Sequence, residues 1–155
     1  MVDKMLVRRK LNKMIKYIGQ LEEVNKYTLE DYLDNFFIKR TTERLVQLVV
    51  EVATDINAHI VVDEGYSPPD DYYNSFLRLS EIGVISQSFA KELAPSAGLR
   101  NRLVHEYEEI DDKIVFKSIK KAIENYSKYI KIVEKYLKNN WFSGGKLDES
   151  ICTGW

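Results

Sequence analysis

Apolar residues recur along the chain at intervals of three and four, the spacing that places them on one face of an α-helix. Residues 45–62 are apolar on two sides, which is typical of a helix at the centre of a bundle or at a subunit contact. No long segment alternates apolar and polar residues, so the pattern predicts an all-α protein. The apolar face of the first predicted helix, residues 3–25, consists of Leu11, Met14, Ile15, Ile18, Leu21 and Val24.

Residues that cap helices divide the chain into its predicted elements. Thr28 and Asp31 have the spacing of a capping box and begin a helical region that extends to about Val62 and can bend near Asn35. Residues 67–70, Ser-Pro-Pro-Asp, predict the start of another helix. Helices with short connections pack as an antiparallel, up-and-down bundle. The other residues expected to start, perturb or end helices are Gly83, Ser86, Pro95, Gly98 and Asp111.

The chain is expected to form one domain followed by a short tail. Its 155 residues, of which 45% are hydrophobic, suffice for one substantial core but are few for two domains. Residues 3–138 carry the helical pattern, and residues 139–155 lose it and are expected to be a C-terminal tail. Lysine and arginine number 23 and aspartate and glutamate 24, so any contact with nucleic acid must come from a local basic patch.

Three features point to a cytoplasmic protein. The N-terminal segment mixes charges with its apolar residues and has no small-residue cleavage site, so no signal peptide is expected. Cys152 is the single cysteine and cannot form a disulfide within the chain, which suits a reducing compartment. No membrane span is expected, because polar residues interrupt the most apolar segment. These are Gln47, Glu51, Asp55, Asn57 and His59.

The densest cluster of polar residues lies between Arg100 and Tyr107. Histidine can exchange a proton near neutral pH, and the donors of arginine fit a phosphate group. On an ideal helix Asn101 and Arg102 lie four and three residues before His105 and can support it, whereas Arg100 lies about 140° away around the axis. The cluster therefore predicts a site for phosphodiester cleavage in which Arg100 reaches around the helix or acts across an interface.

Cleavage of RNA without a metal ion needs a base for the 2′-hydroxyl, an acid for the 5′-oxygen and a cation beside the phosphate. One subunit offers a single histidine in this cluster. We therefore predict a homodimer whose two-fold axis brings two copies of Arg100, His105 and Tyr107 to one cleft. The sequence contains no Glu-x-x-His or Cys-x-x-Cys spacing, so no metal site and no cofactor are expected, and His59 is interpreted as structural.

The sequence at 98–111, Gly-Leu-Arg-Asn-Arg-Leu-Val-His-Glu-Tyr-Glu-Glu-Ile-Asp, resembles the signature of the HepT toxins, a family of HEPN-domain ribonucleases. That signature is an arginine, four residues, a histidine, any residue and a tyrosine. The resemblance covers about residues 3–138 through the order of the helices. It implies an HEPN-like bundle and a metal-independent endoribonuclease with Arg100 and His105 as catalytic residues, leaving a 2′,3′-cyclic phosphate.

The resemblance also implies biological partners. The enzyme would be the toxin of a toxin–antitoxin pair, with RNA as its substrate and an MntA-like minimal nucleotidyltransferase as its antitoxin. In this family the antitoxin attaches AMP to the tyrosine of the motif, which corresponds to Tyr107. A bulky anionic adduct there would occupy the place where the RNA phosphate must lie.

Two other interpretations stay open at the level of sequence. The cluster could be the docking surface of a non-catalytic helical module that binds a nucleotidyltransferase. Alternatively, His105 and Tyr107 could be partly buried structural residues, with the arginines in surface ion pairs with Glu106, Glu108 or Glu109. A stability loss without a change of activity in His105→Ala would favour the structural interpretation.

The last predicted helix carries a row of lysines on its outer side. Such a row is more often a solvated face than a binding surface. It could also guide RNA toward the cleft. The lysines are Lys117, Lys120, Lys121, Lys128, Lys131, Lys135 and Lys138.

Overall fold

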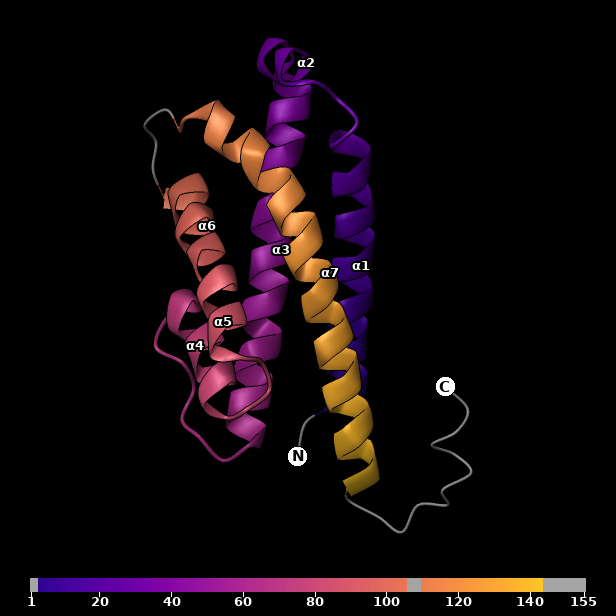
Figure 1. The fold of residues 1–155 in the computed structure, drawn as a ribbon, viewed down its shortest axis with the longest axis vertical. Coiled ribbons are helices and arrows are strands. Elements are labelled where there is room, and N and C mark those ends of the chain that lie inside the picture. The colour runs from indigo at the N-terminus through magenta and orange to yellow at the C-terminus, as the bar shows by residue number, and fades with distance from the viewer. Residues whose placement is uncertain (1–2, 106–109, 144–155) are drawn as a thin grey trace.

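The computed structural model describes residues 3–105 and 110–143, and all of the regular elements in this part of the chain are helices. Helices α1, α3, α6 and α7 alternate in direction, as Figure 1 shows. This arrangement confirms the predicted all-α, antiparallel bundle. The helices are α1 (Lys4–Val24), α2 (Leu29–Asp34), α3 (Phe36–Asp63), α4 (Tyr72–Glu81), α5 (Gln87–Leu93), α6 (Pro95–His105) and α7 (Asp112–Ser143).

The predicted caps at Thr28 and Ser86 are confirmed, and Asp3 and Asn35 are two further caps that were not predicted. Asp3 caps α1, and Thr28 and Asp31 form the reciprocal capping box of α2, with N···O distances of 3.1 and 3.2 Å. Asn35 adopts an extended conformation (φ −126°, ψ 105°) and caps α3, so the expected bend is a complete break between two helices. Ser86 caps α5.

The predicted start of α4 was wrong. Asp71, and not the segment 67–70, caps the helix, because its Oδ1 accepts a hydrogen bond from the Asn74 amide at 2.7 Å. Its second oxygen, Oδ2, accepts from the Asn74 side chain at 2.8 Å. Both prolines of 67–70 therefore precede the helix. Gly83 follows α4 with φ 84°, the left-handed conformation that glycine adopts without strain, so the predicted end is confirmed.

The boundaries around the polar cluster are set by Pro95 and Asp111. Pro95 is the first residue of α6, where its missing N–H costs nothing, and Ala94 separates α5 from α6. Asp111 accepts a hydrogen bond from the Lys113 amide at 3.0 Å at the start of α7. Helix α7 extends to Ser143, beyond the point where the helical pattern was expected to end. Residues 144–155 lie outside the described residues, so the division into domain and tail stays a prediction.

Helix α3 is the central helix of the bundle and packs against α1, α2, α4, α6 and α7. Because α3 has neighbours on several sides, both of its apolar sides contact other helices, as the sequence pattern predicted for a central helix. By length and composition alone α3 could cross a membrane, but 56% of its most apolar window is buried inside the bundle. The hydropathy of α3 is therefore that of a core helix.

A buried polar network joins α7, α3 and α4. The Tyr129 hydroxyl donates to the Asn57 side-chain oxygen, and the Asn57 amide donates to Ser75 Oγ at 3.0 Å. Ser75 Oγ in turn donates to the carbonyl of Tyr72 at 2.7 Å. Buried polar groups with satisfied hydrogen bonds fix one arrangement of neighbouring helices. The network therefore holds the first turn of α4, which carries Tyr72, at a fixed place beside α3.

Candidate functional site

The polar cluster lies on α6, a short helix anchored by a few apolar residues. Ala97 is fully buried, and Leu99 and Leu103 are half-buried against the core. At the start of the helix, Ser96 Oγ donates to the Leu93 carbonyl at 2.6 Å. These contacts fix one side of α6 to the core, whereas Asn101 and His105 are exposed to solvent.

Arg100 forms an ion pair with Glu51 of α3 on the inner side of α6. Its Nε and Nη2 donate to Glu51 Oε1 at 3.1 and 2.7 Å, and the two side chains are 13% and 29% exposed. Gln47, one turn before Glu51, donates to the same oxygen at 3.0 Å. Glu51 thus receives three hydrogen bonds at one oxygen, and Arg100 is tied to the central helix of the bundle.

Two further contacts orient the guanidinium group of Arg100. It lies over the ring of Tyr72 at 4.6 Å from the ring centroid, a cation–π contact with α4. Its Nη1 donates to Asn101 Oδ1 at 3.2 Å. Of the five N–H donors of arginine, three are therefore occupied by residues that the structure describes, and two have no partner among those residues. Two such donors on a fixed cation are suited to a phosphate group.

Glu51 is ionised at neutral pH. Its partial burial acts to raise the pKa of the carboxyl group. The hydrogen bonds from Arg100 and Gln47, together with the positive charges of Arg100 and Arg44, outweigh burial and hold the pKa below its usual value. The charged pair with Arg100 consequently persists throughout the neutral pH range.

His105 is the last residue of α6 and is exposed, as is Asn101 one turn earlier, whereas Arg102 is half-buried. Within the described residues no hydrogen bond or ion pair joins Arg100 to His105, since Arg100 faces α3 and α4. This agrees with the divergence of the two side chains expected from helical geometry. Asn101 bonds to Arg100 and not to His105. Tyr107 lies outside the described residues.

Sequence reasoning missed Glu51 and Tyr72. Glu51 was noted only as a polar interruption of an apolar segment, although its spacing of four from Gln47 puts both on one side of a central helix.

His59, on the same helix, is exposed and lies about 12 Å along the axis from Glu51. In the described part of the chain no three histidine, cysteine, aspartate or glutamate residues are grouped as metal ligands would be.

Comparison with known proteins identifies the family. A family model described as Ribonuclease HepT-like matches residues 14–133. The chain is similar to the tRNA nuclease HepT of Aphanizomenon flos-aquae (strain 2012/KM1/D3), with 35% identity over 136 residues that cover 88% of this chain and 92% of the relative. It is also similar to the mRNA nuclease HepT of Shewanella oneidensis (strain MR-1), with 28% identity over 57% of this chain and 67% of the relative.

Solved structures agree on the fold. A tri-AMPylated HEPN toxin of Shewanella oneidensis in complex with its MNT antitoxin superposes with a TM-score of 0.78 at 23% identity, covering 87% of this chain and 99% of the toxin. The cytosolic protein YutE of Bacillus subtilis superposes with a TM-score of 0.77 at 17% identity, over 90% and 93% of the two chains. The chain therefore has the HEPN fold and belongs to the HepT-like ribonuclease family, as the motif on α6 indicated.

Proposed function

We propose that the chain is a metal-independent endoribonuclease whose active site is built from Arg100 and His105. The observation that carries this proposal is the contrast between the two side chains. Arg100 is held by Glu51 and Tyr72, with two donors that have no partner within residues 3–105 and 110–143, and His105 is exposed at the end of the same helix. A fixed cation for the phosphate and a solvent-accessible proton carrier are what RNA cleavage without a metal requires.

The proposed reaction is a transesterification within the RNA. A neutral imidazole of His105 takes the proton of the 2′-hydroxyl, and the 2′-oxygen forms a bond to phosphorus. A protonated imidazole gives its proton to the 5′-oxygen as the bond from phosphorus to that oxygen breaks. The products are a 2′,3′-cyclic phosphate and a 5′-hydroxyl end, and the same two donors of Arg100 stabilise the charge on the phosphate oxygens.

The two proton transfers need two imidazoles, which supports a homodimer. His105 is the single histidine of the motif, and His59 lies away from it on α3. In a two-fold dimer a second copy of α6 supplies the second His105, and the Arg100 of either copy can face the phosphate. The divergence of Arg100 and His105 on α6 is accommodated by such a shared cleft.

The relatives favour a role as the toxin of a toxin–antitoxin pair in the cytoplasm. One relative is named a tRNA nuclease, and a structural neighbour is a HEPN toxin bound to an MNT antitoxin in a tri-AMPylated form. We propose an MntA-like nucleotidyltransferase as the antitoxin and Tyr107 as the residue that receives AMP. An adduct two residues after His105 would block the approach of RNA to that imidazole.

Growth of bacteria that express the chain tests this function. The native chain is expected to arrest growth, and His105→Ala is expected to be harmless. His59→Ala is the control and should arrest growth like the native chain, because His59 matches His105 in residue type and exposure but lies outside the motif. Co-expression of an MntA-like nucleotidyltransferase should restore growth. Arrest by His105→Ala equal to that of the native chain would contradict the proposal. Tight binding of the nucleotidyltransferase without any RNA cleavage would favour the docking module instead.

A further inference from the structure

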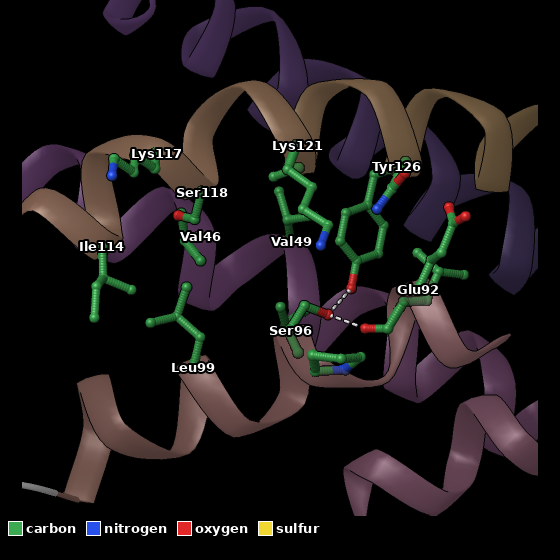
Figure 2. Close-up of a pocket in the computed structure, with 15 residues that line it drawn as sticks. Val46, Val49, Glu92, Ser96, Leu99, Ile114, Lys117, Ser118, Lys121 and Tyr126 are labelled. Carbon is green, nitrogen blue, oxygen red and sulfur yellow. Dashed lines mark hydrogen bonds between the residues drawn. The ribbon is translucent and has the colours of Figure 1, made fainter. Parts of the chain in front are cut away.

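A groove of about 310 Å³ lies between α6 and α7, with α3 as its floor (Figure 2). Val46 and Val49 of α3 and Leu99 of α6 form much of its apolar wall. At one end Ser96 Oγ and the Tyr126 hydroxyl form a hydrogen bond of 2.6 Å that joins the two helices. This volume is at the lower limit of ligand pockets, about 300–1,000 Å³, so the groove suits one small ring system and not a large cofactor.

The α7 side of the groove carries two lysines. Lys117 and Lys121 line it, are exposed, and are separated by one helical turn, about 6 Å along the axis. Figure 2 shows the side chain of Lys121 extending toward α6 beside the ring of Tyr126. Within the described residues neither lysine forms an ion pair. Glu92 of α5 also lines the groove, so its lining carries one carboxylate beside the two lysines. The two neighbouring cations on α7 complement a ligand with a flat apolar part and a row of negative charges.

One polar side chain on the α7 side of the groove can recognise the edge of a nucleobase. Asn125 lines the groove and is half-buried, and its side-chain amide makes no hydrogen bond within the part of the chain that the structure describes. A side-chain amide both donates and accepts, as the polar edge of a base does. Tyr126 is 1% exposed, so its ring closes one end of the groove as part of the apolar lining and is not a stacking surface. An acyl chain would leave the Asn125 amide unsatisfied.

The groove and the proposed catalytic histidine share helix α6. Leu99, which lines the groove, precedes His105 by six residues, about 9 Å along the axis and about 120° around it. A strand that runs from the groove to His105 must therefore pass around the helix. Building on the ribonuclease function proposed above, we infer that the groove binds one unpaired base of the RNA substrate, a few nucleotides from the cleaved bond, while Lys117 and Lys121 contact the adjoining phosphates.

Binding of uncleavable RNA tests this inference. The probes are fluorescein-labelled tetranucleotides of A, C, G or U with 2′-O-methyl groups, which lack the attacking hydroxyl, and the readout is fluorescence anisotropy. We expect Lys117→Ala/Lys121→Ala to raise Kd about tenfold and to lower the slope of log K against log salt by about 1.4, or 0.7 per phosphate contact. Lys120→Ala/Lys128→Ala is the matched control, since both lysines are exposed on α7 and neither lines the groove. We expect the control to change Kd less than about twofold.

Asn125→Ala is expected to level the differences in Kd among the four tetranucleotides, because it removes the group that reads the base edge. Affinities, salt slopes and base preferences that match those of the control in both groove variants would overturn the inference. Conversion of a dimer to a monomer by Lys117→Ala/Lys121→Ala would also overturn the inference, because the groove would then be a contact surface for a second copy of the chain. Circular dichroism of each variant establishes that it is folded.

The binding assay separates this inference from the ribonuclease proposal. Cleavage of ordinary RNA by the native chain, together with groove variants that bind like the control, would refute the groove alone. Absence of cleavage by the native chain, together with the expected changes in binding, would refute the nuclease function and leave the groove as an RNA-binding site. Absence of cleavage by the native chain, together with groove variants that bind like the control, would refute the nuclease function and the groove as an RNA-binding site.

Discussion

Glu51→Gln is the substitution that tests how Arg100 is held. It keeps the size of the side chain and one acceptor, but it removes the charge that faces the guanidinium. The two bonds from Arg100, at 2.7 and 3.1 Å, then change from charge-assisted to neutral. A charged hydrogen bond contributes about 1.5–3 kcal/mol and a neutral one about 0.5–1.5 kcal/mol. Because both side chains are mostly shielded from solvent, we expect a loss of about 1–2 kcal/mol in the free energy of unfolding at pH 7.

The effect of Glu51→Gln is expected to depend on pH in a defined direction. In the folded chain the pKa of Glu51 is below its usual value, since hydrogen bonds from Arg100 and Gln47 outweigh partial burial. The stabilisation by the charged carboxylate is therefore complete above the ordinary pKa of glutamate, about 4.3, and is lost as the pH falls through the lower folded-state pKa. The native chain and the variant should differ fully at pH 6–7 and converge below about pH 4.

Urea unfolding followed by circular dichroism measures this difference, with Glu43→Gln as the matched control. Glu43 is also on α3 and pairs with Arg40 at 2.8 Å, but that pair lies within one helix and Arg40 is exposed. We expect the control to lose at most about 0.5 kcal/mol. We expect RNA cleavage by Glu51→Gln to fall about tenfold as Arg100 loses its position. Equal losses in the two variants, or a difference that does not change with pH, would refute the role given to Glu51.

Three further outcomes are expected. Tyr129→Phe should lower the free energy of unfolding by about 1–3 kcal/mol, because it leaves the buried oxygen of Asn57 without its donor, and unchanged urea unfolding would contradict this. Tyr72→Leu should slow RNA cleavage about fivefold by removing the ring beneath Arg100, whereas Tyr73→Leu, at an exposed neighbour, should not; equal rates would contradict the cation–π contact. EDTA should leave the rate of cleavage unchanged, and loss of activity that magnesium restores would contradict metal independence.

The local features of the fold were readable from sequence because they depend on neighbouring residues. The apolar stripe of α1, the capping box at Thr28 and Asp31, and the helix end at Gly83 each involve residues within a few positions of one another. The start of α4 was misplaced because several consecutive residues can cap a helix. Only the observed bonds to Asn74 decide in favour of Asp71.

The partners of Arg100 could not be read from sequence because they come from distant parts of the chain. Glu51 is 49 residues away and is brought to Arg100 only by the packing of α6 against α3. A signal was nevertheless present: Gln47 and Glu51 are polar residues one turn apart on a helix that is otherwise apolar on two sides. Polar groups inside a bundle need partners, so this pair could have been matched to an arginine of another helix.

The most direct test of the central claim is the rate at which purified chain cleaves labelled tRNA in the presence of EDTA. The native chain and His59→Ala are predicted to cleave at the same rate, and His105→Ala is predicted to be slower by about 10²–10⁴-fold. Because His105 is exposed, its replacement should leave the free energy of unfolding within about 0.5 kcal/mol of the native value. Cleavage by His105→Ala at the native rate would contradict the assignment of the active site to α6.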